Sequence, residues 1–144
     1  MGVNRDRILS KISYIKEQMN GIRQLLAEKE DQYILDDPWL IKGLKYSLQT
    51  SVEAVIDISY HIAAKVYNHA PIDARDAIRV LTEGGLVSRE DVPTYNNMIE
   101  FRNRVVHGYQ EVSPARVLEI AHSELSDFER FVCQIAKVLE KVDS

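Results

Sequence analysis

The longest helical pattern in the chain is PWLIKGLKYSLQTSVEAVIDISYHIAAKVYN, residues 38–68. Its apolar residues recur three or four positions apart and therefore line one face of a helix. Asp36 and Asp37 precede it and can cap free N–H groups, and Pro38 fits the first turn, where no N–H is needed. The segment predicts a long helix whose apolar stripe is Leu40, Leu44, Leu48, Val52, Val55, Ile58, Ile62 and Val66.

Similar patterns lie on both sides of this helix, and no segment alternates with the period of a strand. The connectors are short, so neighbouring helices are expected to run antiparallel. The sequence therefore predicts an all-α fold, an up-and-down bundle of four or five helices, as a single domain over residues 1–144. The other expected helices cover residues 3–30, 74–84, 94–107 and 113 to near the C-terminus.

Composition excludes several classes of protein. Hydrophobic residues make up 45% and charged residues 28%, which is typical of a folded globular chain and not of a long disordered tail. No apolar run approaches the ~20 residues of a membrane span, and the charged N-terminus predicts neither a signal nor a transit peptide. The net charge of −4 argues against a general nucleic-acid coat protein. The single Cys133 predicts a buried small hydrophobe in a reducing cytoplasm.

The most informative polar segment is EFRNRVVHGY, residues 100–109. Arg102 offers a planar guanidinium, which can donate two parallel hydrogen bonds to a phosphate. His107 offers an imidazole whose ordinary pKa suits proton transfer near neutral pH. These are the parts for RNA cleavage with no metal or other cofactor. The imidazole would take a proton from a ribose 2′-OH or give one to the leaving oxygen, while the guanidinium stabilises charge on the phosphate.

Helix geometry qualifies this interpretation. Arg102 and His107 are five residues apart, so they point about 140° from one another on an ideal helix. They can converge if the helix loosens at Gly108, or if a twofold dimer brings a second copy of the motif alongside. A purely structural alternative is that Arg102 and Arg104 form ion pairs and His107 caps the helix end.

Other polar residues offer weaker signals. Glu53, Asp57 and His61 lie on one helix face, which favours a line of surface ion pairs; a metal site would usually need ligands from further elements. Asp57 and His61 could also contact and orient Arg102 or His107 without touching the RNA. Four tyrosines could stack on bases, although tyrosines at helical spacing more often fill a core or an interface: Tyr46, Tyr60, Tyr67 and Tyr95. The candidates for extra phosphate contacts are Arg75, Arg79, Arg104 and Arg116.

The segment RNRVVHGY, residues 102–109, resembles the Arg-x4-His-x-Tyr motif of HEPN domains. The likeness is to the HepT-like toxins of MntA–HepT, or type VII, toxin–antitoxin pairs. It extends over nearly the whole chain, through SLQTSVEAVIDISYHIA (47–63), AIRVLTEGGLVS (77–88), MIEFRNRVVHGYQEVSPARVLEI (98–120) and DFERFV (127–132).

This resemblance implies a helical homodimer with metal-independent ribonuclease activity towards RNA such as tRNA or mRNA. Arg102 and His107 would be the catalytic pair, and Asn103 would orient the site. Tyr109 would receive AMP from a minimal nucleotidyltransferase antitoxin, which adds bulk and negative charge beside the pair. Some members of the family are better described as helical partners of a nucleotidyltransferase, so a non-catalytic interaction module is the alternative.

Overall fold

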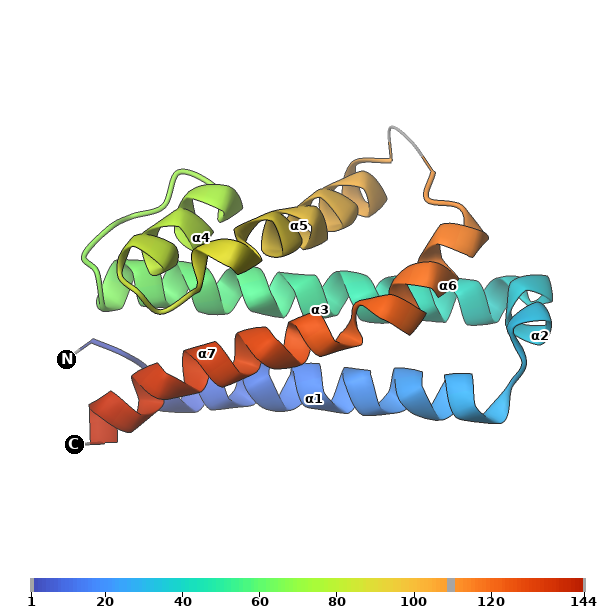
Figure 1. Ribbon diagram of the computed structural model, residues 1–144, viewed down its shortest axis with the longest axis horizontal. Coiled ribbons are helices and arrows are strands. Elements are labelled where there is room, and N and C mark those ends of the chain that lie inside the picture. Colours follow the sequence, from blue (N-terminus) through green and yellow to red (C-terminus); the bar gives the residue numbers. More distant parts are fainter. Residues whose placement is uncertain (1, 109–110, 144) are drawn as a thin grey trace.

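The computed structural model describes residues 2–108 and 111–143 (Figure 1). Within these ranges the chain forms α-helices and one 3₁₀ turn, with no strand. The elements are α1 (Arg5–Glu28), α2 (Asp31–Asp36), α3 (Pro38–Lys65), α4 (Ala74–Glu83), η1 (Arg89–Asp91), α5 (Val92–His107), α6 (Pro114–Ser123) and α7 (Leu125–Asp143). The predicted all-α fold is confirmed.

The helix α3 is the central rod of the molecule. Figure 1 shows α1 and α7 along one side of it and α4 and α5 along the other, and α3 contacts all four of them. The long helices α1, α3, α5 and α7 alternate in direction, as expected of an up-and-down bundle. This arrangement places α5 directly against the C-terminal half of α3.

Side-chain caps fix where the helices begin. Asp37 Oδ1 accepts the N–H groups of Trp39 and Leu40 at 2.9 and 3.3 Å, which starts α3 where the sequence predicts. Asp73 caps α4 and Ser113 caps α6 in the same way. Because these caps satisfy N–H groups that the helix itself cannot, the bounds of the helices follow the sequence closely.

The core forms where the apolar helix stripes meet. Six of the eight predicted stripe residues of α3 are buried, and Leu40 and Val66 are half-buried at its two ends. On the other side of the core, Tyr95 packs edge-on against Phe131 with ring centroids 5.4 Å apart. Its hydroxyl donates to Gln134 Oε1 at 2.7 Å. Tyr95 therefore joins α5 to α7 and fixes the inner face of α5.

The helix count of four or five was too low. The chain forms the short α2 between α1 and α3, and the last predicted helix is two helices, α6 and α7. The break falls at Ser123 and Glu124, where the Ser123 hydroxyl donates to the carbonyl of Glu119 at 2.7 Å. Such bonds from serine back to the helix backbone compete with the regular ladder and bend helices.

The prediction that Cys133 is buried was also wrong. Cys133 is exposed because the buried stripe of α7 passes through Val132 and Ile135 on either side of it. Among the described helices, none is both long and apolar enough to cross a membrane.

Candidate active site

The helix α5 carries the polar motif on a firmly packed scaffold. Tyr95, Met98, Ile99 and Phe101 are buried and hold its inner face. The helix stays regular to His107 and ends at Gly108, which adopts the left-handed conformation (φ 68°) that glycine accommodates without strain. The motif therefore lies in the last two turns of a helix whose position is set by core packing.

Arg102 is held by two acceptors. Its Nε donates to Glu53 Oε2 at 3.2 Å and its Nη1 donates to Asn103 Oδ1 at 3.2 Å. Both Arg102 and Glu53 are about one-third exposed, at 30% and 33%. Among the described residues, these bonds use two of the five guanidinium N–H groups. The remaining three can serve a ligand, so the fork is oriented by the protein without being fully occupied.

His107 occupies the last residue of α5 and is exposed. Because α5 is regular through this position, Arg102 and His107 project from the helix about 140° apart. The helix ends at Gly108, and the convergence of Arg102 and His107 on one phosphate stays a prediction. Tyr109 lies outside the described residues.

The four additional arginines fall into two groups. Arg104 lies within the motif, and both Arg104 and Arg75 approach Glu100 on α5, at 3.2 and 4.0 Å. Arg79 is engaged within α4 by Asp76 and Glu83. Arg116 pairs with Glu119 within α6 and also lines a hollow of about 210 Å³ together with Arg104.

The polar residues in line on α3 contact different parts of the chain. Glu53 turns to Arg102, whereas Asp57 accepts from Lys11 Nζ at 3.0 Å. His61 Nε2 accepts the N–H of Asn4 at 2.9 Å, and burial, with the charges of Arg7 and Lys65, lowers its pKa. In the part of the chain that the structure describes, no group of three His, Cys, Asp or Glu residues is placed to hold a metal ion.

Asp57 and His61 thus contact residues in and before α1, and their supporting role stays a prediction. The contact of Glu53 with Arg102 was not predicted from the sequence. Its only signal there was a carboxylate on a polar face of the long helix, and the partner lies 49 residues away.

A hollow of about 370 Å³ opens directly beside Arg102, between α3, the start of α4, and α5. Its walls combine apolar side chains with polar ones. The lining residues are Ile56, Tyr60, Asp73, Ala74, Arg75, Ile99, Arg102 and Asn103. We call it the Arg102 hollow.

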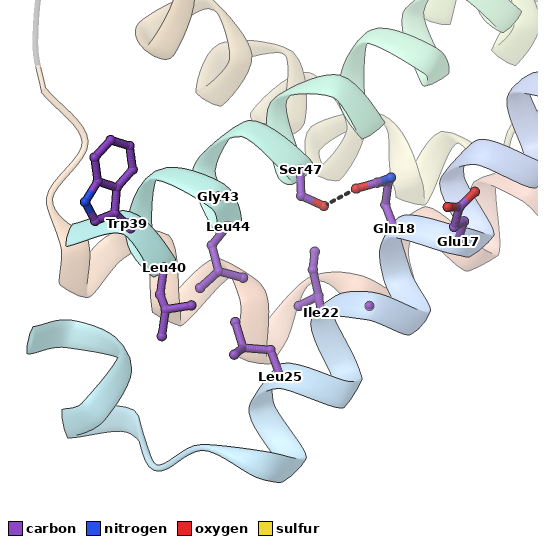
Figure 2. A pocket seen from close by; sticks show the side chains of 10 residues that line it. Glu17, Gln18, Ile22, Leu25, Trp39, Leu40, Gly43, Leu44 and Ser47 are labelled. Carbon is purple, nitrogen blue, oxygen red and sulfur yellow. Dashed lines mark hydrogen bonds between the residues drawn. The ribbon is translucent and has the colours of Figure 1, made fainter. Parts of the chain in front are cut away.

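A second cavity of about 400 Å³ lies between α1 and the N-terminal half of α3 (Figure 2). Its lining is mostly apolar and includes Ile22, Leu25, Leu40 and Leu44, with no arginine, lysine or histidine. Figure 2 shows Trp39 at its edge. The Ser47 hydroxyl donates to Gln18 Oε1 at 2.6 Å across it. We call it the Trp39 groove.

The comparisons with known proteins show the family of the chain. The family model of HepT-like ribonucleases matches residues 15–135, which contain the whole motif and Glu53. The chain belongs to the HepT-like ribonuclease family. The chain is 30% identical over 131 residues to the mRNA nuclease HepT of Shewanella oneidensis strain MR-1, covering 88% of this chain and 94% of that protein.

Solved structures agree as well. A tri-AMPylated Shewanella oneidensis HEPN toxin, solved in complex with its MNT antitoxin, is 29% identical and superposes with a TM-score of 0.84. That match covers 93% of this chain and 99% of the toxin. A toxin–antitoxin structure with AMP-PNP is also 29% identical, with a TM-score of 0.80, over 92% of this chain and 99% of that one.

Proposed function

We propose that this protein is a metal-independent ribonuclease toxin whose catalytic pair is Arg102 and His107. Its substrate is RNA, either tRNA or mRNA. The observation that carries the proposal is the orientation of Arg102 by Glu53 and Asn103 inside the family motif. The related mRNA nuclease and the HEPN toxins solved with their antitoxins support the same activity and biological role.

The proposed reaction is a transfer of the phosphate to the neighbouring 2′-oxygen. His107 removes the 2′-OH proton or delivers a proton to the leaving 5′-oxygen, and solvent water exchanges the other proton. The bond from the 2′-oxygen to phosphorus forms and the bond to the 5′-oxygen breaks, which leaves a cyclic phosphate on one fragment and a 5′-hydroxyl on the other. The three remaining N–H groups of Arg102 stabilise the negative charge on the phosphate oxygens.

Glu53 and Asn103 act as positioning residues in this scheme. A long arginine side chain loses conformational freedom when it binds a phosphate. Because Arg102 is already held from α3 and from its own helix, part of that loss occurs before RNA arrives. The guanidinium is thereby preorganised for charge that develops during the reaction.

We further propose that the active form is a homodimer and that residues 1–144 form one domain in the cytoplasm. The dimer follows from the regular α5, on which Arg102 and His107 diverge. A twofold interface would set His107 of one copy near Arg102 of the other.

The proposed regulation is also based on the family resemblance. We propose that a nucleotidyltransferase antitoxin similar to MntA adds AMP to Tyr109, two residues beyond His107. The added phosphate would compete for Arg102 and repel the RNA backbone. Intact-mass analysis after coexpression should show added AMP on the wild type and none on Tyr109→Phe; an unmodified wild type would contradict this mechanism.

The activity is tested with purified protein and end-labelled RNA in excess EDTA. His107→Ala should slow cleavage by roughly 100-fold or more. The matched control is His122→Ala, because His122 is an exposed histidine paired with Asp31 on a different part of the molecule. The proposal would be overturned if His107→Ala cleaved RNA as fast as the wild type, or if wild-type cleavage were lost in EDTA. No cleavage by any unmodified form, together with capture of a nucleotidyltransferase, would favour the interaction module.

A further inference from the structure

The Arg102 hollow contains side chains that the cleavage reaction does not use. Tyr60 comes from α3 and Arg75 from the first turn of α4, and both line the same cavity as Arg102. Ile56 and Ile99 supply apolar wall. The volume of the hollow lies within the range of roughly 300–1,000 Å³ that is usual for small-ligand sites, and most of its lining residues are polar.

Tyr60 lies on the same face of α3 as the residue that anchors Arg102. Glu53, Ile56 and Tyr60 follow one another at helical spacing, so Tyr60 is roughly 10 Å along the helix from Glu53. Burial, with the carboxylates of Asp73 and Asp76, raises the pKa of Tyr60, and the charge of Arg102 opposes that shift. The ring is therefore neutral at physiological pH and lies within electrostatic range of the guanidinium.

Arg75 stands at the rim of the hollow. Its side chain is 56% exposed and lies 4.0 Å from Glu100, whose carboxylate also accepts from Arg104 at 3.2 Å. Exposed ion pairs of this kind contribute little, so a phosphate can replace Glu100 as the partner of Arg75. Asp73 also lines the cavity while capping α4, and it is exposed like Arg75. Arg75 therefore offers a phosphate contact at the exposed edge of the hollow, beside the half-buried Tyr60.

We propose that the Arg102 hollow is a nucleotide subsite for single-stranded RNA. The Tyr60 ring stacks on the base of the nucleotide next to the cleaved phosphate, and Arg75 binds a phosphate of that nucleotide. This subsite rests on the proposed function, because Arg102 marks the position of the cleaved phosphate. Stacking on tyrosine tolerates any base, which suits a surface that grips single strands without reading their sequence.

The test uses RNA binding by the full chain in the His107→Ala background, where RNA remains intact. Fluorescence anisotropy with a short labelled single-stranded RNA gives the Kd. Tyr60→Leu keeps an apolar side chain but removes the aromatic plane, and should raise the Kd at least about fivefold. Tyr60→Phe keeps the plane and should stay within about twofold of the parent. Tyr46→Leu is the control, because Tyr46 is an exposed tyrosine elsewhere on α3.

The phosphate contact has its own measurement. Arg75→Gln should lower the slope of log Kd against log salt by about 0.7, the value for one phosphate contact on a single strand. Tyr60→Leu should leave that slope unchanged. Arg23→Gln, which removes an arginine paired with Glu129 between α1 and α7, is the matched control. An unchanged slope in Arg75→Gln would overturn the phosphate contact.

The outcomes separate the subsite from the catalytic proposal. If the protein with His107 cuts RNA but Tyr60→Leu binds RNA like its parent, the subsite is wrong and the ribonuclease stands. If RNA binding depends on Tyr60 but no cleavage occurs, the hollow binds single-stranded RNA, but the ribonuclease and the subsite's place beside a cleaved phosphate both fail. Titration with AMP alone tests whether the ligand of the hollow is a free nucleotide instead of RNA. AMP binding that depends on Tyr60, with RNA binding that does not, would assign the hollow to a free nucleotide and overturn the RNA subsite.

Discussion

The Arg102 hollow and the Trp39 groove are similar in size, at about 370 and 400 Å³, but they differ in chemistry. Two arginines, an asparagine and a tyrosine line the hollow, whereas leucine and isoleucine side chains dominate the groove. The same helix contributes to both, through its C-terminal half in the hollow and its N-terminal half in the groove. Cavity size therefore does not distinguish the two; the Arg102 hollow differs in lying beside the Glu53–Arg102 contact between α3 and α5.

The largest expected effect comes from removing the guanidinium in the hollow. Arg102→Ala should lower kcat for RNA cleavage roughly 100- to 1,000-fold, because the charge on the phosphate loses its main stabiliser. Arg102→Lys should recover only part of this, since an ammonium cannot bond Glu53, Asn103 and a phosphate as a planar fork. Single-turnover cleavage rates measure both. If Arg102→Ala cleaved RNA at the wild-type rate, the Arg102 hollow would have no more claim to the chemistry than the Trp39 groove.

The next effect comes from two carboxylates, Glu53, which anchors Arg102, and Glu17, which lines the Trp39 groove. Glu53→Ala should lower kcat about tenfold with a smaller change in KM, because Arg102 loses its anchor on α3. Glu53→Gln keeps an acceptor and should restore part of the rate. Glu17→Ala removes a carboxylate from the Trp39 groove and should leave kcat and KM unchanged. Equal losses in Glu53→Ala and Glu17→Ala would show that the Glu53 contact has no specific role.

The stability of α4, whose first turn borders the hollow, should depend on pH. The N–H of Ile72, with His69 and Arg79, holds the pKa of Asp76 well below its ordinary value of about 3.9. A depressed folded pKa contributes stability above the unfolded pKa and loses it as the pH falls. Asp76→Asn should therefore lower the thermal midpoint at pH 7, and its gap from the wild type should narrow below about pH 4. A gap that is constant from pH 7 to 3 would contradict this.

Two glycines give the smallest and most symmetrical test. Gly43 lies in α3 on the groove, where a Cβ would meet no atom within 4 Å, so Gly43→Ala should stabilise the fold by about 0.5–1 kcal/mol. Gly108 ends α5 with φ at 68°, so Gly108→Ala should destabilise it by about 1 kcal/mol. Urea denaturation measures both changes. Changes of the same sign in the free energy of unfolding would contradict the contrast between helical Gly43 and left-handed Gly108.

Local signals in the sequence predicted much of the fold. Asp37, Asp73 and Ser113 mark helix starts that the structure confirms, because a cap acts within three residues of itself. The six residues of α2 are too few for a helical period to stand out. The break after Ser123 lies within a continuous apolar stripe, and the stripe alone predicts one helix.

The candidate site was predicted only as far as one helix reaches. Arg102, Asn103 and His107 are close in sequence, so their types and spacing already pointed to phosphate chemistry. Glu53 and Tyr60 join them only through the packing of α3 against α5. A single sequence does not specify which faces of two distant helices meet, so the anchor of Arg102 and the hollow beside it required the structure.

The most direct test of the central claim is the chemistry of the RNA ends produced in excess EDTA. If Arg102 and His107 cleave RNA through the 2′-OH, purified protein should yield 2′,3′-cyclic phosphate and 5′-hydroxyl ends, and His107→Ala should yield essentially none. Fragments with 5′-phosphate ends, or cleavage that requires a divalent metal, would contradict this account.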